Sequence, residues 1–310
     1  MVILALSASY IYFLRFHSGS ERVQLNLGLV LKSPNLWIDS ADLSYFCNVA
    51  GTVVCAFLMI AINRLFNVLR TVSEVFVGFF FLFQVSVPAY MGDFSGGIIF
   101  AVLILLATML LYSSYQEPDL TRRVFLVFFL LAFGSLFEYG FLFFIPLFLF
   151  GCYQVRNLSP RGLVAVFLGL ITPFWILWGF DLIHLSDFHT LPPPDFTGFF
   201  NFSDSTEISV AVLFATGTAI VTGVMNLLKV ISFNNRSRVY FSFLSALGVL
   251  AALLCVVDCN NILFYTPLLY CMTAMQGGMF MRLYQDSRAY ILFPVILGVN
   301  SLIYIWSLIN

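Results

Sequence analysis

The sequence is poor in charged residues, which make up only 9% of its 310 residues. Soluble domains carry about 25% charged residues. A chain that is 61% hydrophobic has more apolar surface than a soluble fold of this length can bury. A net charge of −1 also provides no electrostatic basis for binding nucleic acid. The composition therefore excludes a soluble domain and indicates a chain that lies largely in lipid.

Other common signals are missing as well. The six cysteines show no regular spacing, so we expect neither a disulfide framework nor a cysteine metal site. Alternating segments of about ten residues, which are typical of outer-membrane barrels, are also missing. The apolar runs are instead continuous and 14 to 22 residues long. Because a backbone in lipid must satisfy its own hydrogen bonds, continuous runs of this length indicate helices.

The apolar runs predict an all-α, polytopic transmembrane bundle that forms one integral-membrane domain over residues 1–310. We predict about eleven spans, at residues 2–16, 46–63, 72–91, 95–114, 123–137, 139–154, 162–182, 208–228, 238–257, 261–280 and 289–308. The first run lacks the basic leader and cleavage site of a signal peptide, so we interpret it as a helix and leave its start open.

The fifth and sixth spans share one apolar stretch that is broken only around Glu138 and Gly140. We expect a tight hairpin at the outer surface there. Glu138 is either in that exposed loop, which we favour, or buried with a partner, because an ionisable group among apolar residues needs one or the other.

Basic residues accumulate on one side of the predicted topology. Only Arg15, Arg22 and Lys32 fall on the other side. The larger set is Arg64, Arg70, Arg122, Arg123, Arg156, Arg161, Lys229, Arg236, Arg238, Arg282 and Arg288. Because cytoplasmic loops are enriched in basic residues, we predict a cytoplasmic N-terminus and an external C-terminus. Most Asp and Glu residues and all three histidines are then external.

Two predicted external loops, 17–45 and 183–207, are long enough to be partly ordered. In the first, leucines alternate with polar or small residues before Trp37. We interpret it as an interfacial segment anchored by Trp37, and the alternation also permits a short strand. The second contains Pro192-Pro193-Pro194, followed by four phenylalanines that we expect to return to the interface.

Residues 115–180 contain a distinctive order of sequence features. They begin Tyr-Gln-Glu-Pro-Asp-Leu-Thr-Arg-Arg, continue through an apolar hairpin with Gly134-Ser135-Leu136-Phe137, and then show Arg156, Arg161 and Gly169-Leu170-Ile171-Thr172-Pro173-Phe174. This order resembles an uncharacterised family of multi-pass inner-membrane proteins of Bacteroidetes. The resemblance covers about a quarter of the chain. It implies a bacterial cytoplasmic membrane and carries over no catalytic residues.

Asp39 and Asp42 are the candidate catalytic residues. They lie three residues apart, just before the second predicted span, and would share one face of a helix. An acid in the first external loop is typical of membrane glycosyltransferases that use polyprenyl-phosphate sugars. Such an acid acts as a general base or holds a metal ion against a phosphate. The alternative is that Asp39 or Ser40 caps the helix and Asp42 is simply solvated.

His184, Asp187 and His189 are the candidate metal ligands, together with the neighbouring Asp181 and Asp195. Neutral imidazole and carboxylate bind divalent ions, so a divalent metal is the one cofactor that we consider. The spacing matches no tight metal signature, and a solvated acidic loop is the simpler interpretation.

Three functional hypotheses follow for a protein whose main partner is the lipid bilayer. The first is a lipid-linked glycosyltransferase-like enzyme with an outward-facing site and a lipid-phosphate substrate. The second is a non-catalytic subunit that binds other envelope proteins. The third is a transporter or flippase, which should have a central cavity lined by residues such as Gln84, Asn226 and Gln276.

Overall fold

The computed structural model describes residues 2–16, 29–38, 40–68, 73–88, 94–115, 120–155, 159–183, 206–230, 233–258, 261–284 and 287–309. These residues form eleven α-helices and two short 3-10 helices, with no strand among them. The α-helices are α1 (Val2–Phe16), α2 (Ala41–Phe66), α3 (Ser73–Ser86), α5 (Gly96–Ser113), α6 (Leu120–Phe137), α7 (Ile145–Gln154), α8 (Pro160–Gly179), α9 (Thr206–Val230), α10 (Asn235–Val257), α11 (Ile262–Leu283) and α12 (Ser287–Ile309). The 3-10 helices are η1 (Pro34–Leu36) and η2 (Tyr139–Phe144).

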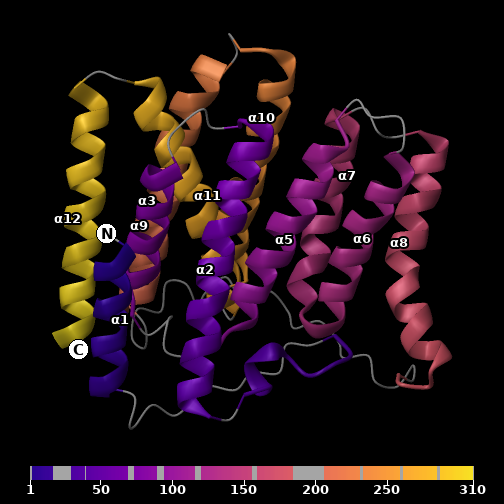
Figure 1. Ribbon diagram of the computed structural model, residues 1–310, viewed down its shortest axis with the longest axis horizontal. Coiled ribbons are helices and arrows are strands. Elements are labelled where there is room, and N and C mark those ends of the chain that lie inside the picture. The colour runs from indigo at the N-terminus through magenta and orange to yellow at the C-terminus, as the bar shows by residue number, and fades with distance from the viewer. Residues whose placement is uncertain are drawn as a thin grey trace.

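Each of the eleven predicted spans overlaps one of these α-helices, so the predicted helical segments are confirmed. Among the described helices, six are long and apolar enough to cross a membrane: α2, α5, α8, α9, α10 and the Ile291–Ile309 part of α12. The helices run side by side, with α1 and α12 at one edge and α8 at the other (Figure 1). This all-helical architecture is that of a multi-pass membrane protein.

Helix α11 is the centre of the bundle. Every residue from 264 to 280 is buried, and α11 packs against α3, α5, α9 and α10. Its small residues allow close contact: a Cβ on Gly278 would lie 2.8 Å from the Cβ of Phe76 on α3. Because protein rather than lipid surrounds α11, the helix accommodates polar residues. The Thr273 hydroxyl donates to the Ala215 carbonyl of α9, and the Gln276 side chain packs against Gly223 of α9.

A cluster of aromatic rings fills the bundle between α5, η2 and α11. The Phe100 ring lies 4.4 Å from Phe264, 4.9 Å from Phe141 and 5.0 Å from Phe144, measured between ring centroids. Two of these pairs are edge-to-face, an arrangement that stabilises beyond the buried area alone. This cluster holds η2 against the start of α11.

The break between the fifth and sixth predicted spans is confirmed. Helix α6 ends at Phe137, Glu138 is extended, and η2 then leads into α7. At Gly140 the chain passes so close to α11 that a Cβ would lie 2.5 Å from the Phe264 ring. A side chain does not fit there, which explains the need for glycine at the turn.

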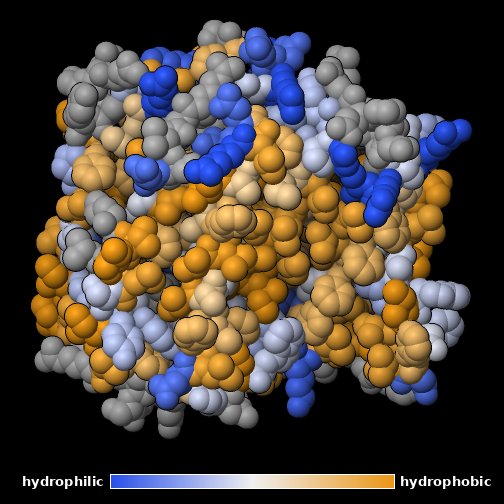
Figure 2. Space-filling model, viewed as in Figure 1, coloured by the Kyte–Doolittle hydropathy of each residue, from blue (hydrophilic) through white to orange (hydrophobic). Residues whose placement is uncertain are grey.

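The two ends of the bundle differ in charge. We call the end where α2 finishes and α6 begins the basic end, because it carries most of the described Arg and Lys residues: Arg64, Arg122, Arg123, Arg161, Lys229, Arg236, Arg238 and Arg282. The opposite, acidic end carries Asp42, Glu138, Asp181, Glu207 and Asp258, with Lys32. An apolar band separates blue patches at the two ends (Figure 2). Both the predicted charge segregation and a lipid-facing belt are therefore present.

Candidate functional site

The predicted catalytic pair is described only in part, because Asp39 lies outside the described residues. Asp42 is exposed in the first turn of α2, at the acidic end. Ser40 is the N-cap residue of α2, although its side chain makes no capping hydrogen bond. A carboxylate in the first helical turn is favoured by the partial positive charge of the helix N-terminus. Because its side chain is exposed, Asp42 is accessible from solution at this end of the bundle.

The predicted metal ligands His184, Asp187 and His189 all lie outside the described residues, as does Asp195. Asp181 is described and lies just after α8, in a left-handed backbone conformation with φ of 56°. Within the described ranges, no three His, Cys, Asp or Glu side chains group closely enough to hold a metal ion. The divalent-metal hypothesis therefore stays a prediction.

The structure instead brings two buried carboxylates to the acidic end. Glu138, between α6 and η2, is only 1% exposed, and Asp258, the C-cap residue of α10, is 9% exposed. The favoured expectation of an exposed Glu138 is therefore wrong, and the alternative of burial with a partner is correct. The reason is that residues 29–38 fold over the end of α6 and exclude water from Glu138.

Residues 29–38 are held in place by backbone and side-chain bonds. The N–H groups of Val30 and Leu31 donate to the Leu136 carbonyl at 3.2 and 2.9 Å, and so bind the last turn of α6. The hydroxyl of Ser33, fully buried, donates to Oε1 of Glu138. Trp37 packs edge-on against Phe137, with 5.3 Å between ring centroids. Trp37 thus packs on the protein with one side of its ring and remains half exposed, and the described part of this loop contains η1. Most of the alternating residues for which a strand was an alternative lie outside the described residues.

Asp258 accepts hydrogen bonds from two phenols. The hydroxyl groups of Tyr139 and Tyr265 both donate to its Oδ2, at 2.6 and 2.9 Å. Because Tyr139 directly follows Glu138, these bonds connect the two carboxylates through one backbone segment. The start of η2 is thereby joined to the end of α10 and the start of α11.

The N-terminus of α5 completes the site. A Cβ on Gly96 would lie 3.1 Å from Oε1 of Glu138, so glycine lets the carboxyl group approach the first turn of α5. The Gly96 N–H donates to Oδ1 of Asn35 at 2.6 Å. Two residues earlier, the Phe94 N–H donates to Oγ of Ser44 at 2.7 Å. Ser44 is two residues after Asp42, so Asp42 and Glu138 lie on two segments that both contact the start of α5.

Burial has a clear electrostatic effect on Glu138, which lies outside both flanking helices. The pKa of its carboxyl is raised from 4.5 to about 7. Desolvation is the largest cause, the hydrogen bond from Ser33 acts in the opposite direction, and the Asp258 charge raises the pKa further. Its Oε2 is buried without a hydrogen-bond partner among the described residues. A carboxyl group with a pKa near neutrality can both give and take a proton under physiological conditions.

The apolar surroundings of Glu138 mark it in the sequence, but its partners do not stand out there. Ser33, Tyr139 and Tyr265 are ordinary residues in sequence, and Asp258 is one of many acids on the predicted external side. The contacts of Ser33 with Glu138 and of Tyr139 with Asp258 join segments more than one hundred residues apart. The one available signal was the rarity of ionisable groups next to apolar runs.

An all-helical bundle with six helices able to cross a bilayer, segregated end charges and a buried carboxylate pair defines the chain as a polytopic membrane protein. The chain matches no protein-family model, no curated protein and no solved structure.

Proposed function

We propose that this protein is an enzyme of the bacterial cytoplasmic membrane that acts on a lipid-linked substrate at its acidic end. The proposed reaction is sugar transfer from a polyprenyl-phosphate donor. The observation that carries the proposal is that two carboxylates flank the start of α5 at the acidic end: buried Glu138 lies beside Gly96, and exposed Asp42 lies two residues from Ser44, which binds the Phe94 N–H.

The three carboxylates have different proposed roles. Asp42 is exposed, so it is the proposed catalytic residue, acting as a general base on an acceptor hydroxyl or holding a metal ion against the donor phosphate. Glu138 and Asp258 are positioning residues: Glu138 holds residues 29–38 through Ser33, and Asp258 holds η2 and the start of α11 through Tyr139 and Tyr265. If a divalent ion takes part, His184, Asp187 and His189 are its proposed ligands.

The proposed orientation places the acidic end outside the cell and the basic end in the cytoplasm. It is supported by the concentration of described Arg and Lys residues at one end of the bundle. Polyprenyl-phosphate sugars enter such a site from the outer leaflet, which the exposed apolar side chains near the start of α2, Leu43 and Phe46, would contact.

The transporter hypothesis receives less support. Asn226 donates through Nδ2 to the Gln276 backbone carbonyl at 2.8 Å. A Cβ on Gly223 would lie 3.1 Å from Oε1 of Gln276. These two polar residues therefore occupy a closely packed contact between α9 and α11, which is the interhelical role that such residues commonly have in membranes.

Turnover of a labelled polyprenyl-phosphate sugar by the purified chain in lipid tests the proposal. We expect Asp42→Asn to lower turnover by about 100-fold or more, which is typical of losing a general base. Glu207→Gln is the matched control, because Glu207 is also a carboxylate in the first turn of a helix, α9, at the same end of the bundle. Equal turnover by wild type and Asp42→Asn would overturn the proposal, and the non-catalytic envelope subunit would then be the better hypothesis.

A further inference from the structure

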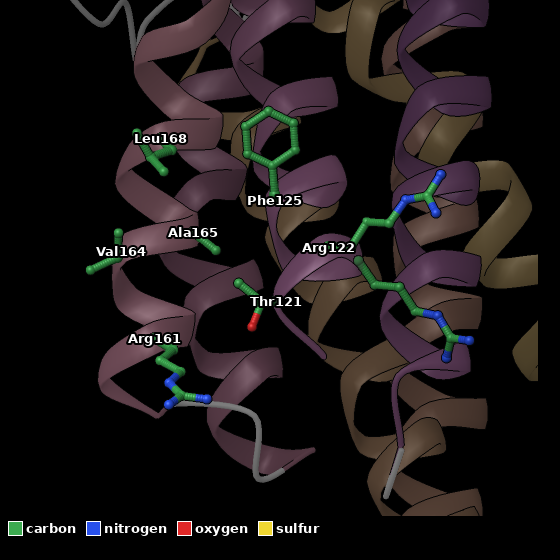
Figure 3. Close-up of a pocket in the computed structure, with 8 residues that line it drawn as sticks. Thr121, Arg122, Phe125, Arg161, Val164, Ala165 and Leu168 are labelled. Atoms are coloured by element: carbon green, nitrogen blue, oxygen red, sulfur yellow. The ribbon is translucent and has the colours of Figure 1, made fainter. Parts of the chain in front are cut away.

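A cavity of about 650 Å³ lies between α6 and α8 at the basic end, far from the carboxylate site. It is lined by Thr121, Arg122, Arg123, Phe125, Arg161, Val164, Ala165 and Leu168. The volume falls within the range of about 300–1,000 Å³ that small-molecule sites occupy. Figure 3 shows Thr121 and Arg161 nearest the helix starts, with Phe125 and Leu168 farther along the helices. The cavity is thus polar at its mouth and apolar toward the membrane interior.

Helices α6 and α8 pack closely against each other, and Gly169 marks a very close approach beyond the cavity. A Cβ on Gly169 would lie 2.6 Å from the Phe125 carbonyl and 3.1 Å from the Phe129 nitrogen, so the two backbones meet there. Toward the basic end, longer side chains line the space between the helices. The Ser159 hydroxyl accepts a hydrogen bond from the Gly162 N–H at 3.1 Å and fixes the first turn of α8, on which Arg161 lies.

The charges at the cavity mouth favour an anion. Both α6 and α8 begin there, and each helix start carries partial positive charge. Arg122 and Arg161, both exposed, add a full positive charge to each of these first turns. Arg123 has a structural partner instead, because its guanidinium donates a hydrogen bond to the Ser113 carbonyl at the end of α5. The positive-inside bias explains why these arginines are at this end, but not why two of them line one cavity.

The wall of the cavity faces lipid. Helix α8 packs mainly on α6 and stands at the edge of the bundle (Figure 1). Val164 and Leu168, which line the cavity, are 58% and 54% exposed, and their neighbour Phe167 is 65% exposed. A ligand in this cavity therefore contacts arginines at the level of lipid headgroups and apolar side chains at the level of acyl chains.

We propose that this cavity binds an anionic phospholipid of the surrounding leaflet, with its phosphate at Arg161 and the first turns of α6 and α8 and an acyl chain along Phe125, Val164 and Leu168. The Arg161 guanidinium can bind a phosphate through paired hydrogen bonds. The Arg122 side chain extends away from Arg161 (Figure 3), so it adds positive charge near the headgroup at longer range. The site is independent of the proposed sugar transfer, because it involves other helices at the opposite end of the bundle.

Lipid binding by the full chain in an uncharged detergent tests this proposal. Native mass spectrometry would compare retention of phosphatidylglycerol with that of phosphatidylcholine of identical acyl chains. With about 1 kcal/mol per basic residue near a lipid phosphate, two arginines correspond to a preference for phosphatidylglycerol of roughly 30-fold. We expect Arg122→Gln/Arg161→Gln to abolish this preference and Arg161→Gln alone to reduce it roughly 5-fold.

Arg64→Gln is the matched control, because Arg64 is an exposed arginine at the same end, in the last turn of α2. It should keep the preference. If Arg64→Gln lowers the preference as much as the double variant, net charge rather than the cavity selects the lipid, and the proposal is overturned. It is also overturned if soluble glycerol phosphate displaces phosphatidylglycerol at equal concentration, because the acyl contacts would then contribute nothing. The single variant keeps the test decisive should the double variant not fold.

Discussion

Tyr112 and Tyr240 exchange hydrogen bonds: the hydroxyl of Tyr112 donates to the Tyr240 carbonyl at 2.6 Å, and the hydroxyl of Tyr240 donates to the Tyr112 carbonyl at 2.9 Å. Their rings stack with 4.3 Å between centroids. The Nε of Arg236 also donates to the Tyr240 hydroxyl, at 3.0 Å. This reciprocal pair joins the end of α5 to the start of α10 at the basic end of the bundle.

The reciprocal bonds predict a specific stability loss. We expect Tyr112→Phe and Tyr240→Phe each to lower the free energy of unfolding by about 1 kcal/mol, because each removes one donor and leaves a buried carbonyl with fewer bonds. Thermal unfolding in detergent measures the loss. Tyr153→Phe is the control, since Tyr153 is 70% exposed. Unfolding temperatures equal to wild type in both variants would show that the pair contributes nothing.

Two helical glycines form a matched test of packing. A Cβ on Gly97 would lie 2.6 Å from the Leu263 carbonyl and 2.7 Å from the Phe264 carbonyl, both backbone atoms that cannot move aside. At Gly78 on α3, a Cβ would meet nothing within 4 Å. We expect Gly97→Ala to lower the unfolding temperature and the yield of folded protein. Gly78→Ala should be neutral or stabilising, by up to about 1 kcal/mol, through helix propensity. Equal behaviour of the two variants would argue against the α5–α11 contact.

Glu138 predicts a dependence of stability on pH. Its pKa of about 7 in the folded protein lies above the ordinary value of 4.5, so the folded state binds the proton more tightly than the unfolded state. The free energy of unfolding should therefore fall as pH rises from about 5 to about 8. The contribution of this one group is roughly 3 kcal/mol.

Two variants isolate this contribution. Glu138→Gln should flatten the pH dependence and make the protein more stable than wild type at pH 8, because no charge is then buried. Ser33→Ala should shift the fall in stability to higher pH, because it removes the donor that lowers the pKa of Glu138. A Glu138→Gln curve parallel to that of wild type between pH 5 and 8 would contradict the assignment. Unfolding in detergent across this range provides the measurement.

The charge segregation predicts the topology in the cell. In a chain with its native cysteines replaced, Asp181→Cys should react with a membrane-impermeant maleimide in intact spheroplasts. Arg282→Cys, at the opposite end, should react only after the membrane is permeabilised. These outcomes follow if the basic end is cytoplasmic. The reverse labelling pattern would invert the proposed orientation and move the Asp42 site to the cytoplasm.

Hydropathy predicted the helices well but not their surroundings. Helix α11 is the most enclosed helix described, and it is less apolar than the exposed α8, because neighbouring helices rather than lipid surround it. The prediction for Glu138 failed for a related reason. A sequence shows that a carboxyl group sits between apolar runs, but it does not show that Ser33, from another segment, covers it.

The sequence by itself determined that this is a helical membrane protein with one basic end. Each apolar run must satisfy its own backbone hydrogen bonds in lipid, whatever helix lies beside it. Only the tertiary structure decided which side chains meet, Glu138 with Ser33 and Asp258 with Tyr139 and Tyr265, and which helices enclose the cavity between α6 and α8. These contacts depend on which helices approach closely, and small residues such as Gly97 and Gly169 permit that approach only in the packed bundle.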